Sequence, residues 1–327
     1  MIRTVGFPLN CKENEHRQAM ILNDIAKMNH KDKLYIEKGY GEFFAVSDET
    51  LRNVGVHVVS REEVLKQDII CDPKAGEADY IGDLQDGQIV FGWIHAVQNE
   101  RLTNTFLSKR LTGIAWEDMN EEGRHVFLRN NEIAGEAAIM HAFSCYGKMP
   151  YDTKVAVLGR GNVARGAYKI LIGLGAEVTV YDRRTEDLFR KESGKYDVLV
   201  NAITWDVSRT DHVIYKEDLK TMKQDAMIID ISCDEGMGIE TSRPTTIEKP
   251  TYYTDSILHY AVDHTPSIFY KTASKSISAQ VGKYLPVIML GHEKKNDIIR
   301  PAIILENGRI YDHKIFENQE RREVRPV

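Results

Sequence analysis

Apolar and polar positions alternate along this chain in the two spacings that belong to strands and helices. In the first 130 residues, stretches with helical spacing separate short apolar runs at 4–7, 34–37, 57–59, 68–71, 88–93 and 111–116. Strands that alternate with helices form parallel sheets joined by crossover helices. This part of the chain therefore predicts an α/β domain.

The same alternation continues in the second half of the chain. A long helical pattern covers residues 132–143, with Asn131 as its expected N-cap, and another follows Thr272. Asn307 and Gly308 are a hairpin signal near the end. Strands are expected at 154–158, 177–181, 197–203 and 226–232, and the last two are nearly unbroken apolar runs, as in strands buried on both faces. A second parallel sheet is therefore expected.

A glycine-rich turn lies between the runs at 154–158 and 177–181. Gly159 permits a tight turn, Gly161 lets the backbone approach a pyrophosphate, and Ala164 allows close packing of helix on strand. The phosphates would lie at a helix N-terminus, which favours negative charge. A simple packing turn is the alternative, but a βαβ unit that ends in Asp182 favours a dinucleotide site.

The same region bears on which dinucleotide binds. Asp182 favours NAD, because an acid at this position accepts the ribose 2′-hydroxyl, whereas Arg183 and Arg184 offer guanidinium groups to a 2′-phosphate. An arginine pair after a strand can also be a solvated turn. We predict NADP, with NAD possible. The predicted cofactor-binding residues are Gly159, Arg160, Gly161, Asn162, Val163, Asp182, Arg183, Arg184 and Ala202.

Length and composition narrow the class of protein. A chain of 327 residues exceeds what one core usually organises, which predicts two domains. The 43 basic and 49 acidic residues leave a net charge of −6 without a basic run, which argues against nucleic acid or membrane partners. Four scattered cysteines suit reduced thiols and no metal site. Without a signal peptide or a long apolar stretch, we expect a cytoplasmic protein that acts on small molecules.

Two strands of the first domain deliver polar residues at their carboxyl ends. Lys74 follows the run at 68–71, and His95 follows the run at 88–93. Ligands collect at this edge of an open α/β sheet, so the two residues could share one site. A cation that polarises a carbonyl oxygen beside an imidazole suits chemistry at a carbonyl or imine carbon. Taken alone, Lys74 could be a solvated loop residue and His95 a hydrogen-bonded strand end.

Arg17 and Asp234 extend this candidate site. Arg17 follows the first strand and could bind a substrate carboxylate with its guanidinium fork, although it could also lie on a helix surface. Asp234 follows the run at 226–232 of the second domain, on the expected nicotinamide side. It could orient the imidazole, accept a proton, or only cap the following turn.

Ordered motifs in both halves resemble the alanine dehydrogenase, transhydrogenase and saccharopine dehydrogenase superfamily. They lie at residues 14–17, 73–74, 87–95, 131–135, 159–166, 230–234, 242–246 and 260–267. Within it, residues 92–95, 161–167 and 264–270 look most like carboxyethylornithine synthases. The resemblance implies two Rossmann-like parallel-sheet domains with a cleft between them, linked by two long helices. It places residues 1–130 and 292–327 in a substrate domain and 131–291 in the dinucleotide-binding domain.

The resemblance also implies an activity. It suggests an NAD(P)H-dependent oxidoreductase acting on CH–NH groups, which joins pyruvate to the side-chain amine of ornithine or lysine and forms a homo-oligomer. Arg17 and Lys74 would hold the keto acid, His95 would be the acid/base group, and Asp234 would assist. Alanine dehydrogenase chemistry, with ammonia as the amine, would use the same residues. A non-catalytic NAD(P) sensor is an alternative of another class.

Overall fold

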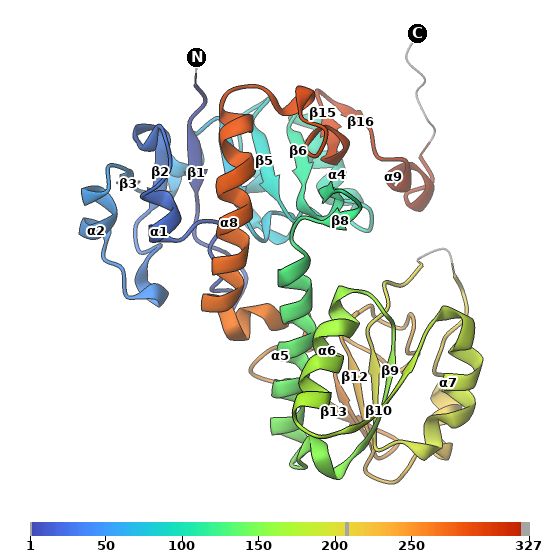
Figure 1. Ribbon diagram of the computed structural model, residues 1–327. Helices are drawn as coiled ribbons and strands as arrows, with labels where there is room; N and C mark the ends of the chain where they lie inside the picture. Colours follow the sequence, from blue (N-terminus) through green and yellow to red (C-terminus); the bar gives the residue numbers. More distant parts are fainter. Residues whose placement is uncertain (1, 207–208, 322–327) are drawn as a thin grey trace. The chain divides into compact units, whose positions relative to one another are not determined.

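The chain folds into two compact units, each built around its own sheet (Figure 1). The computed structural model describes residues 2–206 and 209–321. Unit 1 combines Met1–Phe127 with Tyr270–Val327, and unit 2 is Leu128–Phe269. Both sheets are predominantly parallel and both units contain crossover helices, which confirms the predicted fold class.

Unit 1 contains an eight-stranded sheet with the order β16-β15-β6-β5-β4-β1-β2-β3. From β1 the chain adds β2 and β3 on one side and then β4, β5 and β6 on the other, all parallel. The direction of addition therefore reverses between β1 and β4, which makes this a topological switch point. The strands are β1 (Val5–Phe7), β2 (Leu34–Glu37), β3 (His57–Val59), β4 (Ile69–Asp72), β5 (Ile89–Gly92), β6 (Thr112–Ala115), β15 (Ile303–Glu306) and β16 (Arg309–Ile310).

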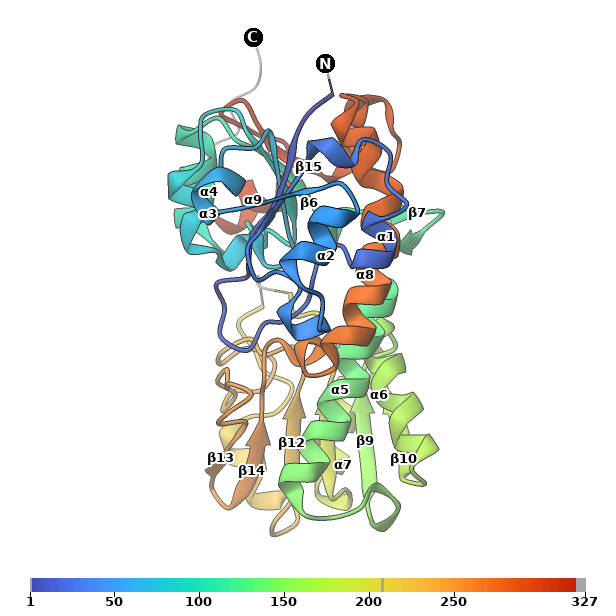
Figure 2. The same ribbon diagram turned by 90° about the vertical axis from the view of Figure 1, so that its left-hand side faces the viewer.

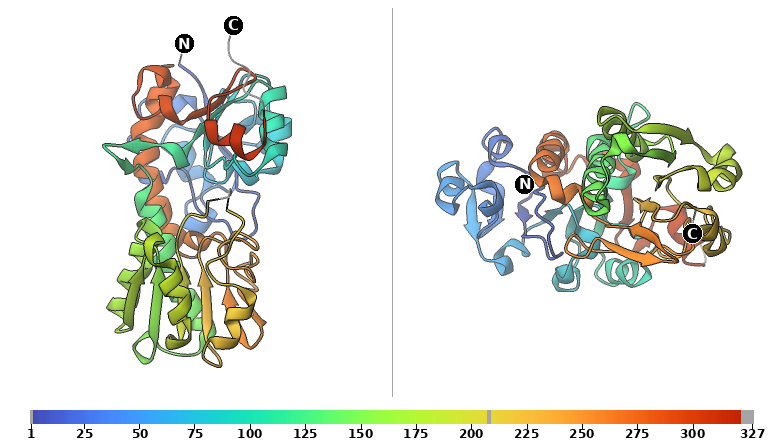
Figure 3. Two further views of the ribbon diagram at one scale, coloured as in Figure 1. Left: turned by 90° about the vertical axis from the view of Figure 1, so that its right-hand side faces the viewer. Right: turned by 90° about the horizontal axis from the view of Figure 1, so that it is seen from below.

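The edge hairpin of unit 1 confirms its sequence signal. Strands β15 and β16 pair antiparallel, and Asn307 and Gly308 between them have φ angles of 50° and 74°. Positive φ at both positions matches the twist of a two-residue hairpin. A second short antiparallel pair, β7 (Asn120–Glu121) and β8 (Arg124–His125), extends to helix α8, where Lys283 pairs with Glu121 at 2.6 Å (Figure 3).

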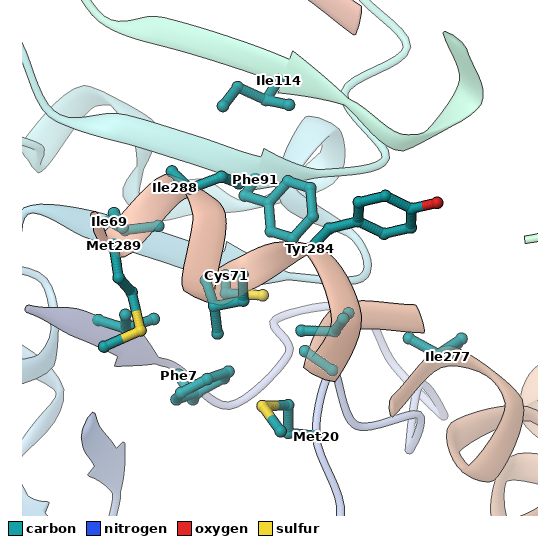
Figure 4. Packing of buried hydrophobic residues seen from close by; sticks show 14 of the residues in the cluster. Phe7, Met20, Ile69, Cys71, Phe91, Ile114, Ile277, Tyr284, Ile288 and Met289 are labelled. Atoms are coloured by element: carbon teal, nitrogen blue, oxygen red, sulfur yellow. The ribbon is translucent and has the colours of Figure 1, made fainter. Parts of the chain in front are cut away.

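Helix α8 packs on the sheet of unit 1. Tyr284, Ile288 and Met289 face the core beside Phe91 and Ile69 (Figure 4). The helices of this unit are α1 (Leu22–Ile25), α2 (Asp48–Asn53), α3 (Arg61–Val64), α4 (Glu100–Ser108), α8 (Tyr270–Met289) and α9 (His313–Asn318).

The observed division differs from the predicted boundaries at both long helices. The prediction placed α8 with the dinucleotide domain and began the next segment at residue 292, but the apolar face of α8 is buried in the core of unit 1. Helix α5 (Leu128–Tyr146) begins before Asn131, so Asn131 lies inside the helix and is not its N-cap. The amphipathic pattern predicts a buried helix face but not which core buries it.

Unit 2 contains a six-stranded sheet with the order β10-β9-β11-β12-β14-β13. Only β13 runs antiparallel. Helices α5 and α6 (Asn162–Gly173) lie side by side along this sheet (Figure 2), and α7 (Glu186–Glu192) follows β10. The strands are β9 (Lys154–Leu158), β10 (Glu177–Tyr181), β11 (Val198–Asn201), β12 (Met227–Asp230), β13 (Thr251–Thr254) and β14 (Ile257–Tyr260).

Candidate functional site

The switch point of unit 1 gathers polar side chains at the carboxyl ends of β1 and β4. Asn10, after β1, donates from Nδ2 to Oδ1 of Asp72 at 3.0 Å, and Tyr80 donates its hydroxyl to Oδ2 at 2.5 Å. The backbone N–H of Lys74 also donates to Oδ1, at 2.8 Å. Burial raises the pKa of Asp72 to about 6. Asp72 therefore connects both strand ends to the loop that carries Lys74.

Lys74 is buried at this edge and is not the solvated loop residue of the alternative interpretation. Only 8% of the residue is exposed. Its ammonium group pairs with Glu77, which also binds Lys12 at 2.5 Å. Burial lowers the pKa of Lys74, and the positive charges of Lys12 and Arg17 lower it further. The negative charge of Glu77 raises it, but the pKa still lies below its usual value. A buried ammonium with a lowered pKa is a good candidate proton donor and carbonyl polariser.

Arg17 is also buried, in an irregular segment and not on a helix surface. Glu15 accepts hydrogen bonds from its Nε, at 2.8 Å, and from its Nη2, at 2.5 Å, and the guanidinium lies 5.2 Å from the ring centre of Trp93. Burial alone would raise the pKa of Glu15, but Arg17 outweighs this effect and the pKa lies below its usual value.

Helix α8 fixes the segment that carries Arg17. The backbone N–H of Gln18 donates to Oγ of Ser274 at 2.8 Å, and the N–H of Ile21 donates to Oγ of Ser278 at 3.0 Å. The segment belongs to no helix or strand that would accept these N–H groups. Two serine hydroxyls, one helical turn apart on α8, accept them instead.

His95 lies in the loop after β5, next to the loop that carries Lys74. Strands β4 and β5 are paired up to Asp72 and Gly92, and the N–H of Gly76 donates to the carbonyl of Trp93 at 2.9 Å. A Cβ on Gly76 would meet the Ile94 carbonyl oxygen at 2.0 Å, so the two loops approach too closely for a side chain there.

Glu117 holds the His95 backbone in an unusual conformation. Its carboxylate accepts the N–H groups of Ile94, at 3.2 Å, and His95, at 2.6 Å. His95 has a φ of 50°, uncommon for a residue other than glycine, and its side chain is 53% exposed. Its Nδ1 lies 3.8 Å from Oε1 of Glu117. Backbone outliers of this kind cluster at functional sites.

The glycine loop of unit 2 has the geometry that the fingerprint predicts. Gly159 has a φ of 127°, and a Cβ there would meet the Ala202 carbonyl oxygen at 2.7 Å. Gly161 is the N-cap of α6, and a Cβ there would meet nothing within 4 Å. Asn162 and Val163 form the first turn of the helix. Since β9 and β11 are neighbours and β10 lies on the other side of β9, the loop also marks a switch point, the place where open α/β sheets bind ligands.

Asp182 follows β10 and caps the short helix Arg183–Thr185. Its Oδ1 accepts the backbone N–H of Arg184 at 3.0 Å, and its Oδ2 forms an ion pair with Nε of Arg160 at 3.3 Å. Arg183 donates to the carbonyl of Thr204 at 2.7 Å. The acid and the three arginines named in the prediction therefore lie at one end of the sheet.

Asp234 lies in the loop after β12. Its backbone carbonyl accepts the N–H of Met237 at 3.2 Å, whereas its carboxylate makes no hydrogen bond within residues 2–206 and 209–321. The side chain therefore does not cap the turn. Burial raises the pKa of Asp234 to about 6, and the charge of Asp230 acts in the same direction. A pKa near neutrality suits proton transfer.

Comparison with known proteins identifies the family. Residues 6–133 match the N-terminal domain of alanine dehydrogenase/PNT, and residues 183–313 match the C-terminal domain. An N(5)-(carboxyethyl)ornithine synthase of Clostridium botulinum is 31% identical over 298 residues, which cover 86% of this chain and 93% of the relative. The chain belongs to the alanine dehydrogenase/PNT family.

Other members of the alanine dehydrogenase/PNT family are also similar. An N(5)-(carboxyethyl)ornithine synthase of Lactococcus lactis is 29% identical over 81% of this chain and 90% of its own. An alanine dehydrogenase of Methanococcus maripaludis is 28% identical over 92% and 91% of the two chains. Residues 123–235 also match the NAD-binding domain of D-isomer specific 2-hydroxyacid dehydrogenases. The predictions of an enzyme, and of an NAD(P)-dependent oxidoreductase acting on CH–NH groups, are confirmed.

Solved structures share the fold at lower sequence identity. An L-alanine dehydrogenase superposes with a TM-score of 0.82 at 19% identity, over 97% of this chain and 99% of its own. A transhydrogenase from Sinorhizobium meliloti gives 0.79 at 17% identity, over 94% and 100%. Within the described ranges, no helix combines the length and apolar character needed to span a bilayer, and no three His, Cys, Asp or Glu side chains are grouped to hold a metal ion.

Four acidic residues next to predicted site residues were not given roles from the sequence. In unit 1, Glu15, Glu77 and Glu117 hold Arg17, Lys74 and the His95 loop. In unit 2, the charge of buried Asp230 acts on Asp234. Glu77, three residues after Lys74, could have been noticed from its spacing. Glu117 could not, because it follows a different strand from His95.

Proposed function

We propose that this enzyme reductively joins a 2-oxo acid, pyruvate, to the side-chain amine of ornithine or lysine. The observation that carries the proposal is the edge of the unit 1 sheet, where the loops after β4 and β5 lie together and bring buried Lys74 beside the His95 loop. The similarity to carboxyethylornithine synthases supports this choice of amines.

The 2-oxo acid would bind through its negative charge. Arg17, oriented by Glu15, would attract the carboxylate, and Lys74 would polarise the keto oxygen. The amine nitrogen would attack the carbonyl carbon to give a carbinolamine. Lys74, whose pKa is lowered by burial, is suited to protonate the developing oxyanion.

His95 would then move the protons that expel water from the carbinolamine and leave an imine. Its ring is exposed and so is accessible to a substrate, and Glu117 fixes the backbone from which the ring extends. Asp234, with a pKa raised to about 6 by burial, would assist proton transfer on the nicotinamide side of unit 2.

Unit 2 would hold NADPH, with NADH as the other possibility. A reduced nicotinamide supplies the hydride that converts the imine into the secondary amine. Gly159, Gly161 and the first turn of α6 would bind the pyrophosphate, and the residues around Asp182 would bind the adenosine ribose.

A direct assay tests this proposal. Purified protein is given NADPH or NADH with pyruvate, and ornithine, lysine or ammonia is added separately while the loss of nicotinamide absorbance is followed. We expect turnover with ornithine or lysine, and a secondary amine whose mass equals amine plus pyruvate minus oxygen. Turnover with ammonia alone would instead establish alanine dehydrogenase activity, which the similarity to alanine dehydrogenases makes the second candidate. Cofactor binding without turnover would favour a sensor.

The role of His95 has its own test. Replacing His95 with Ala should lower turnover by about 100-fold or more, because the protons of dehydration lose their carrier. NADPH binding should not change, since the cofactor residues belong to unit 2. His57→Ala, which removes an exposed histidine of β3 in the same unit, is the matched control and should keep full activity. Wild-type turnover in the His95 variant would refute the assignment.

A further inference from the structure

The carboxylate of Asp182 already has partners at the position where a ribose hydroxyl would bind. In dinucleotide-binding folds an acid at the end of the second strand accepts a hydroxyl of the adenosine ribose. Here Oδ2 faces Nε of Arg160 at 3.3 Å, and Oδ1 accepts the N–H of Arg184 at 3.0 Å. Thr185 Oγ1 lies 3.4 Å from Oδ1. A ribose hydroxyl would have to compete with these donors.

One exposed guanidinium group lies beside this carboxylate, and a second belongs to a residue whose backbone the carboxylate caps. The side chain of Arg160 is 69% exposed, and Arg184 is exposed and donates no side-chain hydrogen bond within the described residues. Arg183 is used differently, because its guanidinium donates to the Thr204 carbonyl at 2.7 Å. Asp182 therefore has its negative charge balanced by Arg160, and the arginines at 160 and 184 keep exposed guanidinium groups that suit an anion better than a neutral hydroxyl.

The place of Arg160 in the glycine loop also bears on phosphate binding. It lies between Gly159 and Gly161, where a bulky side chain could obstruct the approach of phosphate to the helix N-terminus. Its side chain is directed to Asp182 instead. The ion pair thus explains how an arginine is accommodated in a glycine loop.

We propose that Arg160 selects a cofactor with a 2′-phosphate and that Asp182 is a positioning residue for Arg160, not a ribose ligand. Arg184 would be the second phosphate ligand. The proposal rests on the proposed binding of a reduced dinucleotide by unit 2 and adds the residue that distinguishes NADPH from NADH. The planar fork of arginine matches the oxygens of a phosphate group.

Equilibrium binding of NADPH and of NADH to the full-length protein, followed by nicotinamide fluorescence, tests this inference. The wild type should bind NADPH more tightly. Arg160→Ala should raise the Kd for NADPH by about 10- to 100-fold, which is the effect expected from losing one hydrogen bond between charged groups. Its Kd for NADH should stay the same or fall, because Asp182 becomes available to the ribose. Thermal melting of the variant checks that this exposed substitution leaves the fold intact.

Arg165→Ala is the matched control. Arg165 lies on α6, is 66% exposed and pairs with Glu132 at 3.5 Å, so its removal changes the charge of the same unit without touching Asp182. Both cofactors should bind this variant as they bind the wild type.

Three results would overturn the inference. They are an equal loss of NADPH and NADH binding in Arg160→Ala, a wild type that does not prefer NADPH, and an equal loss of NADPH binding in Arg165→Ala. Because the measurement is binding and not turnover, its failure is distinct from failure of the proposed reaction. A protein that prefers NADPH through Arg160 but joins no amine to pyruvate would refute the reaction and leave this inference standing.

Discussion

Individual charged residues in this protein are buried in pairs, and each pair fixes a side chain of the candidate site. Arg17 is held by Glu15, and Lys74 by Glu77. Taking charges out of water is unfavourable unless they are paired and hydrogen-bonded, so these carboxylates are as necessary to the site as the cations. Burial of Lys74 and Arg17 together argues for a function that needs positive charge at this place.

The Glu15–Arg17 pair gives a stability prediction. Glu15→Gln removes the bidentate carboxylate partner of a buried guanidinium, and the free energy of unfolding should fall by about 3 kcal/mol or more. Urea unfolding measures this. Glu62→Gln is the comparison, because Glu62 and its partner Lys66 have side chains that are 80% and 44% exposed, and an exposed ion pair contributes little to stability. Equal losses in the two variants would contradict the argument.

Asp234 gives a prediction about pH. Its folded-state pKa is about 6, so the folded chain keeps this proton where the unfolded chain, with a pKa of about 4, has lost it. The folded state therefore binds more protons between these values, and this group's contribution to stability falls as pH rises through them. Asp234→Asn imitates the protonated form. It should match the wild type near pH 4 and be more stable above pH 7.

Asp211 is a control, because its pKa shift predicts that stability changes with pH in the opposite direction. Hydrogen bonds from Arg209 lower the pKa of Asp211 to about 2, so its contribution to stability is present above the unfolded pKa of about 4 and is lost as pH falls towards 2. Asp211→Asn should therefore be less stable than the wild type at pH 7. If Asp234→Asn were also less stable there, the account of Asp234 would be wrong.

At the scale of elements, close packing of α5 on α6 sets the position of the dinucleotide loop. A Cβ on Gly135 of α5 would meet the Val163 carbonyl oxygen at 2.0 Å, and a Cβ on Gly166 of α6 would meet the Glu132 carbonyl oxygen at 1.9 Å. Neither contact can relax by rotation of a side chain, because backbone atoms are involved. The two helices therefore approach each other through their glycines.

This packing predicts opposite effects for two glycine substitutions in one helix. Gly166→Ala should destabilise the protein and weaken NADPH binding, because the backbone contact outweighs alanine's helix propensity, worth about 1 kcal/mol. Gly173→Ala, where a Cβ would meet nothing within 4 Å, should raise the free energy of unfolding by up to about that amount. Urea unfolding and cofactor titration measure both. A stabilised Gly166→Ala would refute the packing argument.

At the scale of the whole molecule, the two units have separate cores, and each core contains its own tryptophans. Trp93 and Trp116 are buried in unit 1, and Trp205 is buried in unit 2. These are all three tryptophans of the chain. Fluorescence of Trp→Phe variants can therefore follow each unit by itself.

NADPH should stabilise the two units unequally. A ligand that binds only the folded state stabilises it by about 2.7 kcal/mol at 100 times its Kd, and unit 2 is the proposed binding unit. In a variant without Trp93 and Trp116, the fluorescence of Trp205 gives the unfolding midpoint of unit 2. In Trp205→Phe, the fluorescence of the other two tryptophans gives the midpoint of unit 1. NADPH should raise the midpoint of unit 2 more than the midpoint of unit 1. Equal shifts would show that the units unfold as one or that both bind the cofactor.

The sequence by itself determined the fold class, the glycine loop, the strands that deliver Lys74 and His95, and the edge hairpin. These features depend on local chemistry, such as apolar spacing, positive φ at glycine and residues at strand ends. Only the tertiary structure decided that α8 belongs to unit 1, that Glu15 and Glu117 hold site residues, and that Arg160 pairs with Asp182. Burial and ion pairing depend on which segments meet in space, and a residue pattern along one segment does not specify its neighbours.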